Sequence, residues 1–130
     1  MVRYPESIER RTTLGQSLAV ARTARCFVRQ ALEDSEVAGD VVETVELLTS
    51  EVITNALVHA RSAPELAVRV RPRVVRVEVV DDSPVVPIRR SIDAEAVSGR
   101  GLAIVESLAS NWGVKDLSPD GKTVWFEVAI

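Results

Sequence analysis

The sequence predicts an α/β fold in which helices pack against a mostly antiparallel sheet. Two long stretches repeat apolar residues at steps of three or four, which is the period of a helix that buries one face. Several shorter stretches are rich in Val and alternate apolar with polar residues, as half-buried strands do. An apolar fraction of 46% with only 4% aromatic residues indicates a core built from Val, Leu, Ala and Ile.

Length and cysteine content indicate one domain that needs no disulfide. We expect all 130 residues to form a single domain, with residues 1–9 less ordered. The single cysteine, Cys26, cannot form an internal disulfide, which favours a reducing compartment, and its helical context predicts a packed thiol. No apolar run reaches the ~18 residues of a membrane span, so we expect a cytoplasmic protein without membrane contact.

The charge distribution argues against nucleic-acid binding, because the net charge is −3 and the two signs are interspersed. Four arginines do lie close together in the sequence, at Arg69, Arg71, Arg73 and Arg76. Alternation along two strands is expected to separate them by face, which predicts a solvated sheet surface. An acidic partner site is the alternative.

The first half of the chain is predicted to form an edge strand and two helices. Residues 8–15 are weakly strand-like, and residues 17–33 have a helical pattern with arginines on the outside. Asp40 is a good N-cap for the second helix, and Glu43 follows it at the spacing of a capping box. This helix should run to about Ala60.

The second half is predicted to begin with a hairpin. Residues 65–71 and 74–80 alternate and are joined by a short turn, which is typical of two antiparallel strands. Residues 85–98 show no period, and an irregular loop of this length is more often functional than accidental.

The last part of the chain is predicted to complete the sheet. A third helix over residues 102–110 is followed by a strand near residues 111–115. The Asp120-Gly121 pair then signals a hairpin turn into a closing strand over residues 122–128.

One row of polar side chains marks the second helix. Glu51, Asn55 and His59 are four residues apart, so they stack on one helix face. A carboxylate followed one turn later by an amide oxygen can order a hydroxyl and coordinate a magnesium ion carried by a nucleotide. The alternative is an ordinary solvated face, with His59 in a surface role at the helix end.

Three further signals point to a nucleotide. Gly99 and Gly101 precede the third helix, where glycines let a phosphate approach the first backbone amides, although two glycines also mark simple turns. Asp81, at a strand end, could accept a hydrogen bond from the adenine amino group, and Thr123 could contact the same base. Their alternatives are a turn aspartate and a strand threonine. A P-loop is excluded because no Gly-Lys-Ser/Thr motif follows these glycines. A dinucleotide fingerprint is excluded because the spacing lacks a GxGxxG after a strand.

In this order along the chain, these signals resemble the Bergerat-fold (GHKL) ATP-binding domains over residues 10–130, and among them the bacterial anti-sigma-factor serine/threonine kinases. Residues 51–56 are similar to the N-box of that family, residues 99–105 to its second glycine box and residues 121–126 to its closing strand. The resemblance implies a two-layer α+β sandwich, in which about three helices cover one face of a mostly antiparallel sheet.

The resemblance also implies a site for ATP and Mg²⁺. Glu51 would be the catalytic base, Asn55 would hold the magnesium ion, and Asp81 would read the adenine amino group. A lid over residues 86–98 would cover the triphosphate. The remaining positions that would contact the nucleotide are Ser83, Gly99, Arg100, Gly101, Leu102 and Thr123.

One motif departs from the family pattern. Where the family commonly has Asp-x-Gly-x-Gly, this chain has Asp81-Asp82-Ser83-Pro84-Val85. Side chains in place of both glycines would crowd the adenine side, and proline stiffens the turn.

The resemblance implies a kinase that binds a sigma factor or an antagonist protein and phosphorylates a serine of the antagonist, with a homodimer as one option for its assembly. Arg22, Arg25 and Arg29 of the first helix are the candidate partner surface. One alternative is a regulator that only sequesters its partner, with weak or lost nucleotide binding. A further alternative is an ATPase or sensor-kinase module.

Overall fold

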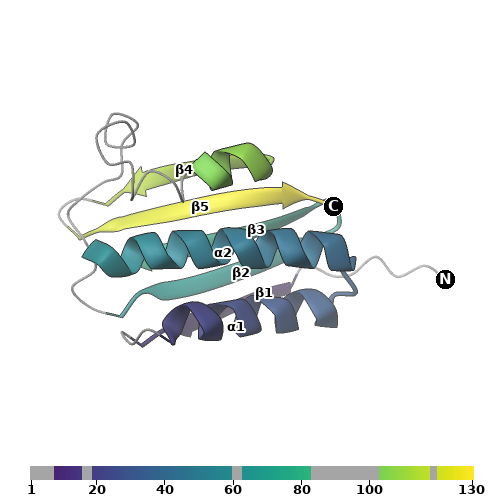
Figure 1. The fold of residues 1–130 in the computed structure, drawn as a ribbon, viewed down its shortest axis with the longest axis horizontal. Helices are drawn as coiled ribbons and strands as arrows, with labels where there is room; N and C mark the ends of the chain where they lie inside the picture. Colours follow the sequence, from purple (N-terminus) through teal and green to yellow (C-terminus); the bar gives the residue numbers. More distant parts are fainter. Residues whose placement is uncertain (1–7, 16–18, 60–62, 83–102, 118–119) are drawn as a thin grey trace.

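The described part of the chain forms two layers, a sheet and a set of helices that covers one of its faces (Figure 1). In the computed structural model this part comprises five segments with gaps between them: residues 8–15, 19–59, 63–82, 103–117 and 120–130. The layered α/β architecture confirms the predicted fold class.

Five strands form one sheet in the order β1-β2-β3-β5-β4, and every neighbouring pair is antiparallel. The strands are β1 (Ile8–Thr13), β2 (Glu65–Arg71), β3 (Val74–Asp81), β4 (Asn111–Asp116) and β5 (Lys122–Ala129). As predicted, β1 is an edge strand and β2 and β3 form a hairpin. Residues 8 and 9 belong to the sheet rather than to a less ordered N-terminus.

The helix layer contains α1 (Val20–Asp34), α2 (Gly39–His59) and a shorter helical segment over residues 103–108. In Figure 1, α2 crosses the middle of the sheet, with α1 on one side of it and residues 103–108 on the other. The helix layer therefore has α2 at its centre.

The predicted N-cap at Asp40 is wrong. The helix α2 already begins at Gly39, and the N–H of Val42 donates to the carbonyl of Ala38 at 3.0 Å. Asp40 therefore lies in the first helical turn, where its charge still favours the positive end of the helix dipole.

The core lies between the two layers and is made of the aliphatic residues that the composition predicts. Its α2 members include Val45, Leu48 and Ile53, which have no exposed surface. They pack in one cluster with alternate residues of the strands, such as Val77 of β3 and Phe126 of β5. The predicted packing of Cys26 is wrong, because this thiol is exposed.

The face of the sheet that the helices leave open carries charged side chains. Arg69 and Arg76 are directly paired across β2 and β3, so they share this face, and the prediction that alternation separates them is wrong. Glutamates are interleaved with them: Arg76 contacts Glu127 at 3.2 Å, and its guanidinium lies 4.2 Å from the centroid of the Trp125 ring. The result is a partly solvated network of alternating charges.

Among the residues that the structure describes, there is no helix whose length and apolar character would let it span a membrane.

Candidate functional site

The predicted site residues that the structure describes lie toward one end of the molecule. At this end α2 reaches its last turns, β3 ends at Asp81 and β5 begins at Lys122 (Figure 1). The antiparallel pairing of β3 with β5 places the end of one strand beside the start of the other. The topology thus brings together segments that lie far apart in the sequence.

Glu51 and Asn55 lie on the side of α2 that faces away from α1. Two other residues of α2 define the opposite side, because Ser50 accepts a hydrogen bond from Arg25 at 2.7 Å and Glu46 pairs with Arg29. Each residue advances about 100° around a helix, so Glu51 and Asn55 are rotated toward residues 103–108. Both side chains are half-buried, which leaves their oxygens access to solvent.

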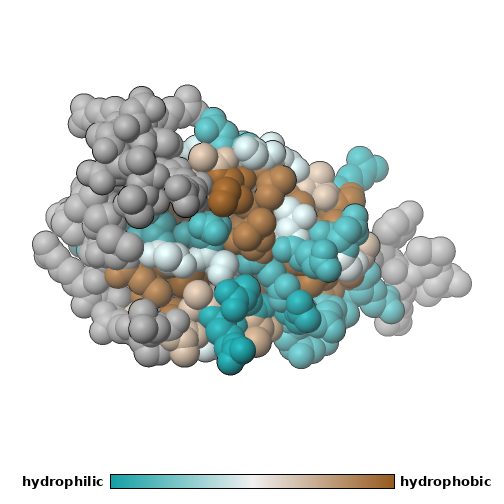
Figure 2. Space-filling model, viewed as in Figure 1, coloured by the Kyte–Doolittle hydropathy of each residue, from teal (hydrophilic) through white to brown (hydrophobic). Residues whose placement is uncertain are grey.

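An exposed apolar residue begins the same row. Leu47 lies one turn before Glu51 and is 42% exposed, and Leu108 of the neighbouring helical segment is 47% exposed. Figure 2 shows apolar atoms gathered near the middle of this face. The polar row therefore continues into a surface that offers apolar contacts.

Asp81 forms an ion pair with Lys122 beneath the helices. The ammonium of Lys122 donates to Oδ1 of Asp81 at 3.0 Å, and the side chains are 1% and 0% exposed, respectively. Asp81 and Lys122 are direct partners in the register of β3 with β5, and both point to the helix face. Loss of one member of a buried ion pair is costly, because the other member stays desolvated without the opposite charge.

Gly121 allows this close approach of the two strands. Its φ of +119° lies in a region that side chains rarely adopt. A Cβ at this position would lie 2.0 Å from the carbonyl oxygen of Asp81 and 2.7 Å from the Cα of Asp82. Only a glycine fits here, and it places the next residue, Lys122, opposite Asp81.

Thr123 does not lie beside Asp81. It pairs with Val80, and successive strand residues point to opposite faces, so its side chain is on the open face while Asp81 is on the helix face. The position of β5 that faces Asp81 is Lys122. Lys122 is absent from the predicted site residues, because its place opposite Asp81 depends on the register of β5 with β3.

The other predicted positions lie outside the described residues. These are the lid over residues 86–98 and the positions Ser83, Gly99, Arg100, Gly101 and Leu102. His59 is the last residue of α2, and the description of the structure does not extend to its side chain.

The residues present fit the two ends of Mg-ATP differently. Glu51 and Asn55 present carboxylate and amide oxygens on an accessible helix face, and such oxygens are suitable ligands for magnesium. At the base end, Oδ1 of Asp81 accepts the ammonium of Lys122, so an adenine amino group would have to share this carboxylate with the lysine. The ion pair at Asp81 is thus a feature of the base end that the sequence analysis does not include.

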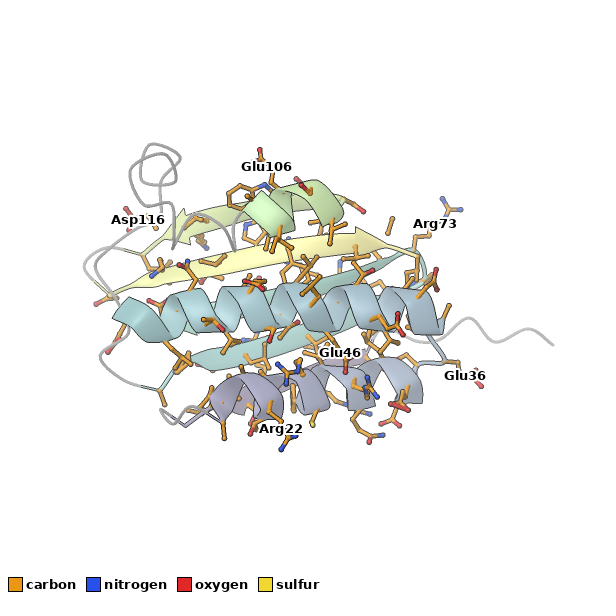
Figure 3. All side chains as sticks on the ribbon, viewed as in Figure 1. Arg22, Glu36, Glu46, Arg73, Glu106 and Asp116 are labelled. Atoms are coloured by element: carbon orange, nitrogen blue, oxygen red, sulfur yellow. The ribbon has the colours of Figure 1, made fainter. Side chains whose placement is uncertain are left out.

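Two of the three arginines proposed as a partner surface act within the helix layer. Arg25 donates to Ser50, and the guanidinium of Arg29 contacts the carboxylate of Glu46, with 2.7 Å between Nη2 and Oε2. This contact raises the pKa of Arg29 above its ordinary value. In Figure 3, Glu46 lies at the boundary with α1, whereas Arg22 points away from the molecule. Arg25 and Arg29 therefore join α1 to α2.

Comparisons with known proteins agree with this architecture. A family model described as "Histidine kinase-like ATPase domain" matches residues 15–128. Among solved structures, the chain is similar to the RsbU and RsbW domains of Rv1364c from Mycobacterium tuberculosis, with a TM-score of 0.72 and 20% identity. That match covers 93% of this chain and 32% of the other, so this chain spans about a third of its length.

A second similar structure is the SiaB-SiaC complex from Pseudomonas aeruginosa, with a TM-score of 0.58 and 12% identity over 93% of this chain and 89% of the other. At these identities, the similarity to either structure is one of fold. A search of curated proteins finds no match.

Proposed function

This chain belongs to the histidine kinase-like ATPase domain family, and from that premise we propose that it is an ATP-using regulatory protein of the anti-sigma-factor type. It binds a protein partner, either a sigma factor or an antagonist of the anti-sigma factor, and phosphorylates a serine of the antagonist with Mg-ATP. The observation that carries this proposal is the row of Glu51 and Asn55, which lies on the face of α2 turned away from α1, toward the end where Asp81 lies.

The two α2 residues have separate roles in this proposal. Asn55 holds the magnesium ion through its amide oxygen, and bound Mg-ATP supplies the phosphoryl group. Glu51 is the general base, because its half-buried carboxylate can accept the proton of a serine hydroxyl. Apolar surface beside this row, with Leu47 at its start, provides a contact for the partner protein.

Titration of the protein with Mg-ATP by calorimetry tests the phosphate end of the site. We expect Asn55→Ala to lower the magnesium-dependent affinity by about tenfold or more, which corresponds to about 1.4 kcal/mol. Thr54→Ala is the matched control, because Thr54 is an exposed neighbour on the same helix turn. Unchanged binding by Asn55→Ala would remove this residue from the proposed site.

Phosphate transfer tests the role of Glu51. With anti-sigma-factor antagonist proteins as acceptors, Glu51→Gln should abolish phosphate incorporation, while Mg-ATP binding remains within about twofold of the wild type. Transfer at the normal rate by this variant would contradict the assignment of Glu51 as the base.

The buried ion pair supports a second candidate function. If the Asp81–Lys122 contact excludes nucleotide altogether, the protein is a regulator that sequesters its partner without catalysis. Tight partner binding without phosphate incorporation at saturating Mg-ATP would favour this candidate. The apolar and polar surface of α2 would then serve only for protein recognition.

A further inference from the structure

We infer that the outer edge of β4 is an interface between two copies of this chain, in which the two β4 strands pair antiparallel and join their sheets into one. In the described part of the chain, β4 is the last strand of the sheet and pairs with β5 alone. Figure 1 shows it along one margin of the sheet. The inference goes beyond the proposed function, because the interface needs neither a nucleotide nor an acceptor protein.

The first support is a contrast between the two edge strands. Open strand edges attract other strands, and proteins protect them with charged side chains. Strand β1 is protected in this way, because Glu9, Arg10 and Arg11 follow one another within it and all three form ion pairs. Residues 111–114 of β4 are uncharged, and the charges of this strand are confined to its last two residues. Of the two edges of the described sheet, β4 is therefore the one without this protection.

The second support is apolar surface on the helix face of this edge. Trp112 pairs with Phe126 and Val114 pairs with Val124, and both of these β5 residues are buried in the core. Trp112 and Val114 share that face but keep part of their surface exposed. A strand added at the edge would bury this remaining surface, and burial of apolar surface favours association.

The third support lies on the open face, where Gly113 pairs with Trp125. A Cβ on Gly113 would lie 2.8 Å from Cζ2 and 3.0 Å from Nε1 of the indole, so the ring lies directly against the backbone of the edge strand. Trp125 is itself only half-buried. The glycine thus lets an aromatic ring of β5 cover the edge strand, where a second copy would present the same ring.

These features favour pairing about a twofold axis that passes through Gly113 perpendicular to the sheet. Such an axis makes the two β4 strands antiparallel and keeps both helix layers on the same side. It places Trp112 opposite the second copy's Val114, and Gly113 opposite the second copy's Gly113. The two Trp125 rings then lie beside each other on the open face, where aromatic contacts stabilise the pair.

The charges of β4 agree with this register. The axis through Gly113 places Asn111 opposite the second copy's Lys115, so an ammonium meets an amide rather than a like charge. An axis through Val114 would place Trp112 opposite an aspartate and Gly113 opposite a lysine of the second copy. An axis through Trp112 would leave only residues 111–113 of β4 within the overlap. The register about Gly113 therefore combines the longer overlap with matched side chains.

Cysteine cross-linking tests this register. In a Cys26→Ser background, Asn111→Cys/Lys115→Cys places thiols at two exposed positions that the interface sets opposite each other. Paired residues of antiparallel strands have Cα atoms about 4.5–5.5 Å apart, which a disulfide can span. Within one copy the two positions are about 13 Å apart, which a disulfide cannot span. We expect mild oxidation to give a covalent dimer in which mass spectrometry finds position 111 joined to position 115.

Two kinds of control match this variant. Each single substitution, Asn111→Cys or Lys115→Cys, should stay largely monomeric on oxidation, because the interface sets identical positions about 13 Å apart. Glu9→Cys/Thr13→Cys in the same background has the same spacing at exposed positions of β1 and should not cross-link. If the paired β4 variant cross-linked no better than these controls, the inference would be overturned.

Charge substitutions at Asn111 test the interface without added cysteines. Asn111→Lys sets like charges opposite each other twice in the dimer, whereas Asn111→Glu sets opposite charges there. In sedimentation over a dilution series, we expect the Kd of the dimer to rise at least about threefold in the first variant and to fall by a similar factor in the second. Asn111→Lys/Lys115→Glu should associate at least as tightly as the wild type.

The outcomes decide the inference independently of nucleotide binding. A wild-type protein that stays monomeric up to about 100 µM would overturn it. A dimer whose Kd changes in the same direction in Asn111→Lys and Asn111→Glu, or in neither, would also overturn it, because association would then use another surface. If the charge variants do not fold, the cross-linking result decides. Loss of the proposed function through absence of nucleotide binding would leave the dimer and its β4 contacts unchanged.

Discussion

Strands β3 and β5 carry charged residues on both of their faces, and the two groups differ in burial rather than in chemistry. On the helix face, Lys122 and Asp81 form an ion pair with side chains that are 1% and 0% exposed. On the open face, Arg76 contacts Glu78 and Glu127 at 3.3 and 3.2 Å, with side chains that are 16–26% exposed. Water can replace a lost partner on the open face but has little access to the helix face.

Burial thus distinguishes the ion pair that involves a predicted site residue, Asp81, from the charges of the open face. The open face has more arginines and glutamates, yet each of its charges has solvent as an alternative partner. On the helix face, the ion pair of Lys122 involves the carboxylate that is expected to read adenine. Substitutions that break the contacts of each region test this difference.

Loss of the buried pair should have the largest effect. Lys122→Ala removes the ammonium from the buried carboxylate of Asp81, and we expect the free energy of unfolding to fall by about 3–5 kcal/mol. Chemical denaturation measures this change. Lys122→Ala/Asp81→Asn should recover part of the loss, because it also removes the remaining charge. If Lys122→Ala lowered the free energy of unfolding by less than about 1 kcal/mol, the buried pair would contribute no more to stability than a surface ion pair does.

Gly121→Ala should have the next largest effect, because it separates the strands that hold the pair. The new Cβ would overlap the carbonyl of Asp81 in a backbone conformation with φ of +119°. We expect a loss of about 2–3 kcal/mol or more in thermal or chemical unfolding. Gly39→Ala is the matched control, since a Cβ there meets nothing within 4 Å. Equal stability of the two variants would contradict the close approach at Gly121.

Removal of a charge from the open face should cost much less. Arg76→Ala deletes the contacts with Glu78 and Glu127 and the stacking on Trp125, and we expect a loss of about 1 kcal/mol or less. The loss should shrink further in high salt, which screens solvated charges. If Arg76→Ala were as destabilising as Lys122→Ala, burial would not be the deciding difference.

The smallest loss of stability should come from breaking the exposed ion pair between Arg10 and Asp34. Hydrogen bonds from Arg10, at 2.7 Å, and from Gln30 hold the pKa of Asp34 below its ordinary value. A carboxylate with a lowered pKa in the folded state stabilises the protein above its unfolded pKa of about 4 and loses this contribution as the pH falls through the folded value.

Arg10→Ala should therefore lower the melting temperature slightly at neutral pH, with the difference from wild type disappearing in acid. Melting curves recorded from neutral pH down to about 3 follow this change. Arg22→Ala is the control, because Arg22 points away from the molecule (Figure 3). A difference that persists or grows in acid would contradict the assignment to Asp34.

Much of the fold could be predicted because the sequence patterns that indicate it lie within short stretches of the chain. The β2–β3 hairpin, α2 and the edge position of β1 follow from periodicity and turn residues in short windows. The placement of Glu51 and Asn55 on one face of α2 follows from their spacing alone. The exposure of Cys26 has a local reason too, because it lies two residues, or about 200°, from the buried Ala24 and Val28.

The contacts that depend on register could not be predicted in the same way. Alternation tells which residues of one strand share a face of the sheet. It does not tell which residues of a neighbouring strand lie on that same face. The pairing of Arg69 with Arg76 comes from the register of β2 with β3. Lys122 and Asp81 are 41 positions apart, and their contact needs both the strand order and the close approach at Gly121. The ion pair between Lys122 and Asp81 therefore follows from the three-dimensional fold rather than from local sequence patterns.

The position of β5 in the sheet also affects how the protein is made. Strand β3 pairs with β2 on one edge and with β5 on the other, and β5 follows it by some forty residues along the chain. Until β5 leaves the ribosome, the second edge of β3 presents unpaired backbone groups next to a row of valines. We therefore expect newly synthesised chains to be prone to aggregation at this stage, and the charges of Arg76 and Glu78 within β3 to disfavour association with another strand.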